Sequence, residues 1–128
     1  DGGPTPPIGI SVPQAMYDDF VEICKPVKNI NPDFPFEVKV AKPRKRPTST
    51  GGTDASVFAV EGVPTYGFTT DDIKGYNFSY GEIWHTERDL YTKNIPEYQE
   101  HTAVVTAIVA LGVANLDKQL SREGMYKE

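Results

Sequence analysis

Hydrophobic positions between Pro13 and Val27 follow a helical period. The apolar side chains recur every three or four residues, at Met16, Phe20, Ile23, Cys24 and Val27. This spacing predicts a helix with one buried face. Pro13 suits the first helical turn and Pro26 should end the helix. Cys24 lies on the apolar face, where we expect it to be a small buried hydrophobe.

Two short segments have the pattern of strands. The sequence "FEVKV" at Phe36–Val40 alternates apolar and charged residues, which predicts a strand with one buried face. The mostly apolar run Val63–Phe68 predicts a fully buried strand. Residues 1–12 are rich in proline and glycine, and we expect them to be irregular.

Two more helices are predicted further along the chain. Thr53 or Asp54 can cap a short helix that ends at Gly62. Pro96 begins a long helix that should fade near Ser121. Its predicted buried stripe consists of Val104, Val105, Ile108, Leu111, Leu116 and Leu120. The order helix, strand, helix, strand, helix predicts a single α/β layered domain over residues 1–128, with a parallel sheet.

Composition limits the possible partners. The chain has 128 residues, a net charge of −5 and 24% charged residues, which is typical of a globular domain and argues against a nucleic-acid partner. The basic run Lys42–Pro47 is short and interrupted by proline, so we interpret it as a solvated loop. Because no stretch contains the ~20 apolar residues of a membrane span, we expect none.

The chain contains two histidines, and they differ in context. His85 follows a long loop, Thr69–Ile83, that is rich in glycine and tyrosine. An imidazole in such a loop is either a zinc ligand or a hydrogen-bonded loop histidine, and spacing alone leaves both alternatives open. His101 lies inside the long helix, where we expect a structural or an exposed side chain. A loop of this length is usually functional or mobile, and its rings Tyr76, Phe78 and Tyr80 could wall a side-chain pocket.

Two motifs with a fixed order resemble a known family. The first is "GGTDASVFAVEGVPTYGF" from Gly51, and the second is "EIWHTERDLY" from Glu82, followed by a long helix. Together they resemble the C-terminal part of the zinc-dependent aminopeptidase family that also includes the glutaminyl cyclases. That family has a G-S-D-H-x-x-F-x-x-x-G-[IV]-P segment and then an H-T-x-x-D motif. This chain departs from the pattern at Ala55, where the family often has histidine.

The resemblance implies roles for individual residues. His85 corresponds to a zinc ligand, and Asp54 to an aspartate that supports catalysis in the hydrogen-bonded surround of the metal. Thr86 and Asp89 would hold the loop. The resemblance also implies a three-layer α/β/α sandwich with a mainly parallel sheet, and two zinc ions in the complete protein. Asp1 could correspond to a further aspartate ligand, although its terminal position gives no context to match.

The expected function follows from the resemblance. We expect residues 1–128 to be the C-terminal part of a zinc exopeptidase that removes N-terminal residues from peptides, inactive without the upstream part of the same domain. One alternative is a glutaminyl cyclase-like acyltransferase, because Trp84 matches a W-H-T variant of those enzymes. Another is a non-catalytic interaction domain that keeps the scaffold. The compartment is left open, with a secreted or periplasmic location favoured only by the family.

Overall fold

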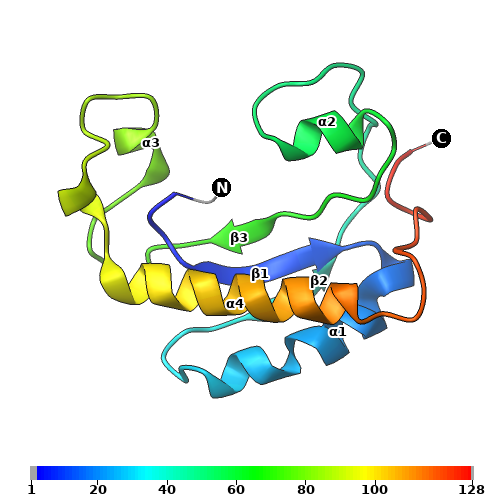
Figure 1. The fold of residues 1–128 in the computed structure, drawn as a ribbon, viewed down its shortest axis with the longest axis horizontal. Helices are drawn as coiled ribbons and strands as arrows, with labels where there is room; N and C mark the ends of the chain where they lie inside the picture. The colour runs from blue at the N-terminus through cyan, green and yellow to red at the C-terminus, as the bar shows by residue number, and fades with distance from the viewer. Residues whose placement is uncertain (1–2, 128) are drawn as a thin grey trace.

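The computed structural model describes residues 3–127 and has the α/β class expected from the sequence (Figure 1). A three-stranded sheet contains β1 (Pro7–Val12), β2 (Glu37–Val40) and β3 (Phe68–Thr70), in the order β2-β1-β3. The central strand β1 runs parallel to β2 and antiparallel to β3. The sheet is therefore mixed.

The central position of β1 corrects the expectation that residues 1–12 are irregular. Ile8, Ile10 and Val12 alternate along the strand, and Ile10 and Val12 belong to the core. Pro7 is tolerated because it is the first residue of the strand. Gly9 is needed for close strand pairing, since a Cβ atom there would lie 2.5 Å from the backbone oxygen of Glu37.

The helix predicted after Pro13 is confirmed. Its α-helical part is α1 (Tyr17–Cys24), between the 3-10 turns η1 (Gln14–Met16) and η2 (Lys25–Asn29). The later helical elements are α2 (Ala55–Ala59), α3 (Tyr80–Ile83), the 3-10 turn η3 (Tyr91–Lys93) and α4 (Pro96–Ala114). The long helix begins at Pro96 as predicted, but it ends at Ala114 rather than near Ser121.

The strand predicted at Val63–Phe68 is wrong for most of its length. Only Phe68 belongs to β3, and residues 63–67 have no regular secondary structure. Thr65 is instead held by Arg44, whose Nη2 donates to the Thr65 carbonyl at 3.2 Å and hydroxyl at 2.7 Å. Hydrogen bonds from the Arg44 side chain thus hold this segment in place of the strand pairing that the apolar pattern predicted.

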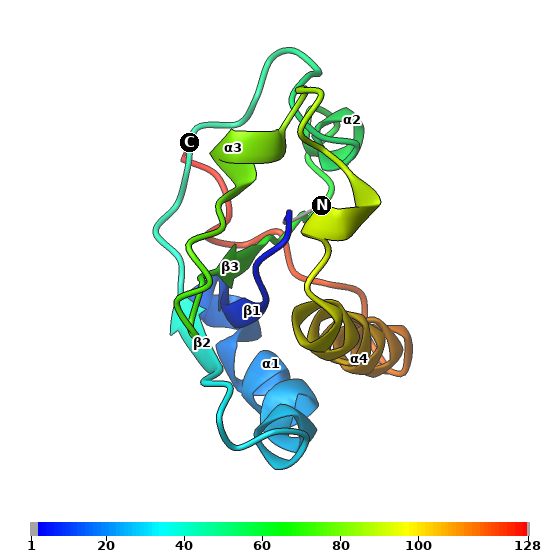
Figure 2. The same cartoon turned by 90° about the vertical axis from the view of Figure 1, so that its left-hand side faces the viewer.

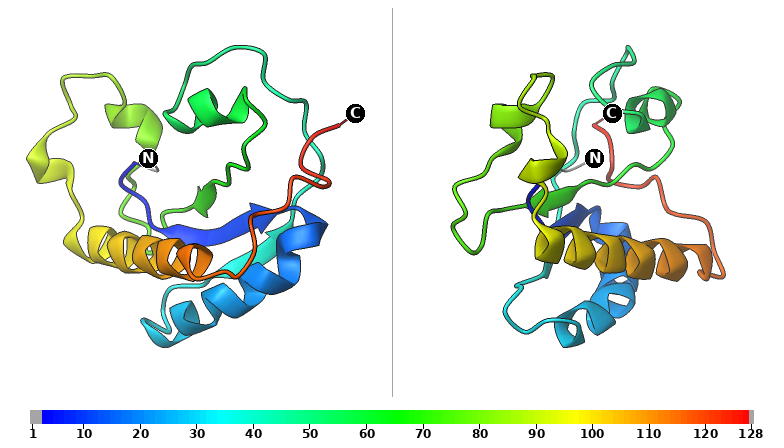
Figure 3. Two further views of the ribbon diagram at one scale, coloured as in Figure 1. Left: turned by 45° about the vertical axis from the view of Figure 1, so that its right-hand side comes forward. Right: turned by 60° about the vertical axis from the view of Figure 1, so that its left-hand side comes forward.

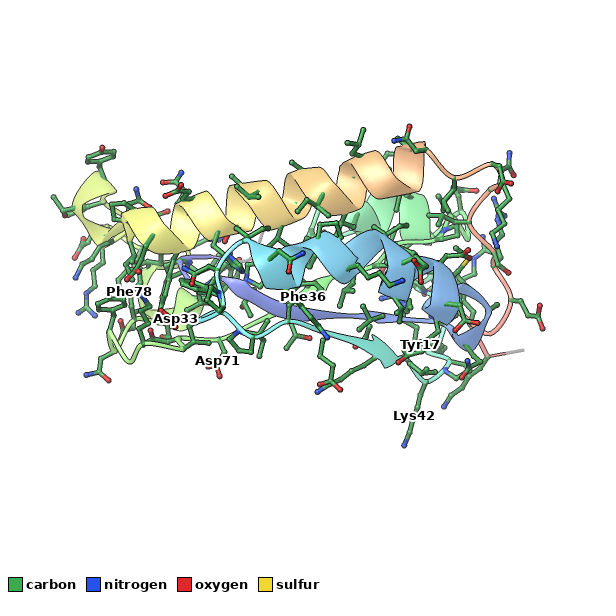
Figure 4. All side chains as sticks on the ribbon, turned by 90° about the horizontal axis from the view of Figure 1, so that it is seen from below. Tyr17, Asp33, Phe36, Lys42, Asp71 and Phe78 are labelled. Atoms are coloured by element: carbon green, nitrogen blue, oxygen red, sulfur yellow. The ribbon has the colours of Figure 1, made fainter. Side chains whose placement is uncertain are left out.

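The core lies between the sheet and the helix pair α1 and α4, which pack side by side over one face of the sheet (Figures 2 and 4). Its buried residues are Ile10, Val12, Met16, Phe20, Cys24, Val27, Phe36, Val105 and Val109. Burial raises the pKa of the Cys24 thiol to about 11, as expected for an inert core cysteine. Within residues 3–127 no helix is both long and apolar enough to cross a bilayer.

The basic run after β2 is exposed, but its two arginines are not merely solvated. Arg46 donates from Nε and Nη2 to the carbonyl of Val60 just after α2. The backbone of Arg44 bonds to both Met125 and Lys127, so the C-terminal segment runs alongside this loop (Figure 3). Met125 is buried, and the two arginines therefore tie the loop, α2 and the chain end together.

Candidate functional site

His85 lies at a cavity of about 590 Å³ formed around α3 and the chain leading into α4. The lining includes Trp84, Asp89, Tyr91 and Gln99. Gly3 and Pro4 also line this cavity, so the start of the described chain reaches the same place. Asp1, the possible further ligand, lies outside the described residues.

The backbone and neighbours of His85 fix the direction of its ring. His85 follows the C-cap of α3 with a φ of 55°, in the left-handed region where histidine is tolerated but strained. Its ring stacks on Trp84 with centroids 4.1 Å apart, and Trp84 in turn stacks on Tyr80 at 6.0 Å. Trp84 is 51% exposed, so this stack stands at the surface.

The imidazole of His85 is available to a ligand. The side chain is exposed, and neither ring nitrogen forms a hydrogen bond to any residue in the described range 3–127. Within this range His85 is therefore not a hydrogen-bonded loop histidine. A stacked ring whose nitrogens bond to no described residue is oriented and can still bind a metal.

Thr86 and Asp89 were both expected to hold the loop after His85, and the side chain of Thr86 does so. Thr86 donates from its hydroxyl to the carbonyls of Glu82 and Ile83, the latter at 2.9 Å, and accepts from the backbone N–H of Arg88. These bonds close the turn that ends α3. Asp89 lines the His85 cavity, and its backbone N–H donates to the carbonyl of Thr86.

Asp54 occupies the N-cap position of α2 without capping it. Its side chain makes no capping hydrogen bond; the hydroxyl of Thr53 accepts the N–H of Ala55 instead, at 3.0 Å. Asp54 is exposed and lines a shallow pocket with Gly51 and Gly52, separate from the His85 cavity. Both α2 and α3 lie on the side of the sheet away from α1 (Figure 1), but their two motif residues do not share a pocket.

The described residues alone do not form a metal site. No group of three or more His, Cys, Asp or Glu side chains in residues 3–127 is arranged to hold a metal ion. A protein zinc site normally needs three or four such ligands. His85 can therefore supply one ligand, and the others would have to come from elsewhere.

The segment Thr69–Ile83, predicted to be a loop, includes the end of β3 and all of α3, and it brings its aromatic rings to two cavities. Tyr76 and Phe78 line a second cavity of about 530 Å³, at the start of α4 where Phe78 is labelled in Figure 4. Tyr80 lines the first cavity. The two cavities share Lys93 and Asn94 in their walls, so they adjoin. The three rings are therefore divided between two adjoining cavities, and their role in holding a substrate side chain stays a prediction.

A hydrogen-bond network fastens this loop to α4. The buried hydroxyl of Tyr98 donates to Asp72 at 2.7 Å and accepts the backbone N–H of Lys74 at 2.8 Å. This bond from Tyr98 lowers the pKa of Asp72, and burial raises that of Tyr98 to about 12. Glu97 pairs with Lys74 at 2.6 Å and accepts from the hydroxyl of Tyr76. The Lys74 partner lowers the pKa of Glu97.

His101 is buried, so the exposed alternative for it is wrong. Its side chain is 3% exposed, and its ring lies 4.3 Å from that of Phe34. Neither ring nitrogen has a hydrogen-bond partner within residues 3–127. Burial lowers the pKa of this imidazole, which favours the neutral form. His101 belongs to the packing under α4 and lies outside both cavities.

Several lining residues were missed in the sequence. Tyr91 and Gln99 come from η3 and α4, on either side of the predicted helix start. Nothing in a single sequence marks them, because they reach the cavity only through the turn at Ile95 and Pro96. Tyr98 was detectable, since it lies three residues before His101 and seven before Val105 on the buried stripe.

No family model, no curated protein and no solved structure matches this chain. The geometry of the site is therefore the basis for its function.

Proposed function

We propose that this chain is part of a zinc-dependent aminopeptidase domain, in which His85 supplies one imidazole ligand. The observation that carries the proposal is the presentation of His85. Its ring is exposed and oriented by Trp84, its nitrogens are free of bonds to described residues, and its backbone is held in a strained conformation. Strain of this kind concentrates at functional sites.

The rest of the domain would complete the site. Since the chain offers a single imidazole at this cavity, the remaining ligands belong to the upstream part of the same domain. The whole domain would then be a three-layer α/β/α sandwich with a mainly parallel sheet. The parallel pair β1–β2, with α1 and α4 over one face, is the portion that such a sandwich would share.

The substrate would be a peptide with a free N-terminus. The adjoining cavity walled by Tyr76 and Phe78 has the size and the apolar walls to receive a side chain next to His85. Asp54 would come close to the residues around the metal only in the complete domain, because in the described residues it lines a different pocket from His85. Its proposed role is to orient groups and not to bind metal.

Two alternative functions have specific support. The stack of Trp84 on His85 suits a glutaminyl cyclase-like acyltransferase, which would close an N-terminal glutamine instead of releasing a residue. The lack of a group of three or more metal ligands among residues 3–127 suits an interaction domain without catalysis. The products formed from an N-terminal glutaminyl peptide separate the three functions: a free amino acid, a cyclised peptide or no change.

The decisive experiment compares variants of the natural protein that contains this chain. His85→Ala should lose bound zinc and aminopeptidase activity together, measured by elemental analysis and aminoacyl-nitroanilide turnover. Asp54→Ala should keep most of its zinc and lose roughly 10–100-fold in rate. Glu87→Ala is the matched control, because Glu87 is exposed in the same loop and lines neither cavity. Full zinc content and normal turnover in His85→Ala would refute the proposal.

A second arm uses the 128-residue chain by itself. It should show no turnover that a chelator abolishes, because it contributes one ligand. Chelator-sensitive hydrolysis by this chain would show that the site is complete within it, and would contradict the fragment interpretation.

A further inference from the structure

A cavity of about 190 Å³ lies at the carboxyl end of the parallel strands β1 and β2. It is walled by the end of β1, the residues after β2, the segment 65–67 and residues 124–125. The C-terminal segment thus passes this end of the sheet (Figure 3). In open α/β sheets, ligands bind outside the carboxyl ends of parallel strands. The position of this cavity therefore suits a ligand.

The charged side chains in the wall of this cavity are basic. Lys42 and Arg44 line it and no Asp or Glu of residues 3–127 does, although the chain has 18 acidic and 13 basic residues. Neither cation pairs with a carboxylate in that range. Lys42 extends into solvent from the end of β2 in Figure 4, so its ammonium lies at the rim. Two unpaired cations at one cavity favour an anionic ligand.

The guanidinium of Arg44 is already oriented. Its Nη2 donates to the carbonyl and the hydroxyl oxygen of Thr65, and its Cζ lies 5.7 Å from the ring centroid of Tyr126. Nε and Nη1 donate to no residue in the described range 3–127. A guanidinium held in this way loses little freedom when its remaining donors bind an oxyanion.

A buried hydroxyl in the wall has no partner. Tyr66 lines the cavity, and its Oη is buried without a hydrogen bond to any residue between 3 and 127. Burial raises the pKa of this phenol, so it stays protonated and can donate. Buried donors in proteins are normally bonded, and an unbonded one favours a site that an acceptor oxygen enters.

We propose that this cavity binds a phosphate group, either as the free ion or as the end of a small phosphate monoester. Arg44 donates to phosphate oxygens from the nitrogens that Thr65 leaves unused, and the Tyr66 hydroxyl donates to another oxygen. Lys42, a point charge on a flexible stem, closes over the mouth. The cavity has room for several water molecules and so for the five heavy atoms of phosphate. The two positive charges match a phosphate dianion.

This site is independent of the proposed enzyme function. Its wall shares no residue with the wall of the His85 cavity. Phosphate binding is measured on the metal-free chain, so zinc does not contribute to it. His85→Ala should keep the wild-type Kd for phosphate, and failure of either proposal leaves the other one standing.

The test is isothermal titration calorimetry of the metal-free 128-residue chain at low ionic strength, with inorganic phosphate and with glycerol 3-phosphate. One site with a Kd of about 1 mM or tighter is expected. Tighter binding of the monoester identifies a small phosphorylated molecule as the ligand, and tighter binding of inorganic phosphate identifies the free ion. Succinate, a dianion without a tetrahedral group, should bind at least about tenfold more weakly.

Substitutions assign the binding to the named side chains. Arg44→Gln should raise the Kd for phosphate at least about tenfold, because charge-assisted hydrogen bonds are lost. Tyr66→Phe keeps the ring and should raise the Kd roughly threefold or more. Lys45→Gln is the matched control, since Lys45 is exposed in the same basic run and lies outside the cavity wall. It removes the same charge and should change the Kd by less than about twofold.

Circular dichroism of each variant checks that the fold is kept. Because Arg44 also holds Thr65, its substitution can disturb the fold. Lys42→Gln breaks no described hydrogen bond and then replaces it, with an expected rise in Kd of about threefold. No binding up to roughly 10 mM phosphate, equal affinity for succinate, or equal weakening by Lys45→Gln and Lys42→Gln would overturn the proposal.

Discussion

The buried imidazole of His101 makes the stability of this chain depend on pH in a defined window. Burial lowers its pKa in the folded state, and its nitrogens have no partners among residues 3–127 to stabilise an added proton. Its nearest ring is Phe34, which is neutral, and Lys74 lies over that ring at 5.3 Å from the centroid. The perturbation we consider is acidification of the wild-type chain and of His101→Leu.

The sign and size follow from proton linkage. An unfolded histidine has a pKa near 6.5, so above that pH neither state carries the proton. Below it, the unfolded chain takes up a proton that folded His101 refuses, and stability falls until the pH reaches the lowered folded pKa. The slope is at most about 1.4 kcal/mol per pH unit, hence a loss of up to about 2 kcal/mol between pH 6.5 and 5.

Other groups titrate in a different range. The pKa values of Asp72 and Glu97 are lowered in the folded chain. Stability from these carboxylates is present above their unfolded pKa values, near 4, and is lost only as the pH falls below them. The interval between pH 6.5 and 5 therefore isolates the histidines.

Urea unfolding followed by circular dichroism at several pH values measures this effect. With a slope of about 2 kcal/mol per molar urea, the wild-type midpoint should fall by up to about 1 M between pH 6.5 and 5. The midpoint of His101→Leu should stay nearly constant, because the titrating group is gone. His85→Ala serves as the control, because a slope that persists in this variant cannot come from His85. Equal slopes in the wild type and His101→Leu would refute the buried, neutral state of His101.

Two further substitutions test packing and loop anchoring. Tyr98→Phe removes the hydroxyl between Asp72 and Lys74. It should lower the free energy of unfolding, measured with urea, by about 1–3 kcal/mol and speed amide exchange in residues 71–78. Tyr91→Phe is the control: this side chain is 91% exposed, and its change should alter neither measurement. Gly112→Ala places a Cβ atom 2.4 Å from Cγ2 of Ile23, so it should destabilise by about 1 kcal/mol despite the better helix propensity of alanine. Adding Ile23→Ala should cost less than the sum of the two single changes, and simple additivity would exclude the clash.

The elements that the sequence predicted well have strong local periodicity. The helix after Pro13 and the helix from Pro96 repeat apolar residues every three or four positions, and both begin where expected. Strand β1 was not predicted, because the prolines and glycines around "IGISV" indicated an irregular segment and obscured the alternating apolar residues of the strand. Its conformation depends on pairing with both β2 and β3, and such distant pairing leaves no mark in a local window.

The candidate site was predictable only in part. The motifs identified His85 and Asp54, but the turn after α3 decides where His85 points and which residues surround it. The predicted stripe on α4 included Val104 and Leu111, which are exposed, because a helix apolar on all sides gives no periodic contrast from which to choose a face. The motifs also did not show that Asp54 and His85 line separate pockets.

Contacts of the C-terminal segment 121–127 with residues early in the chain bear on when the core is completed during synthesis of the protein. The backbone of Ser121 donates to the sulfur of Met16 at 3.2 Å, and Lys127 donates to the carbonyl of Arg44 at 2.9 Å. Met16 belongs to the core, so one wall of that core is completed by a residue made more than a hundred positions later. Before residue 121 is made, Met16 therefore lacks this contact, although its neighbours in the chain are already present.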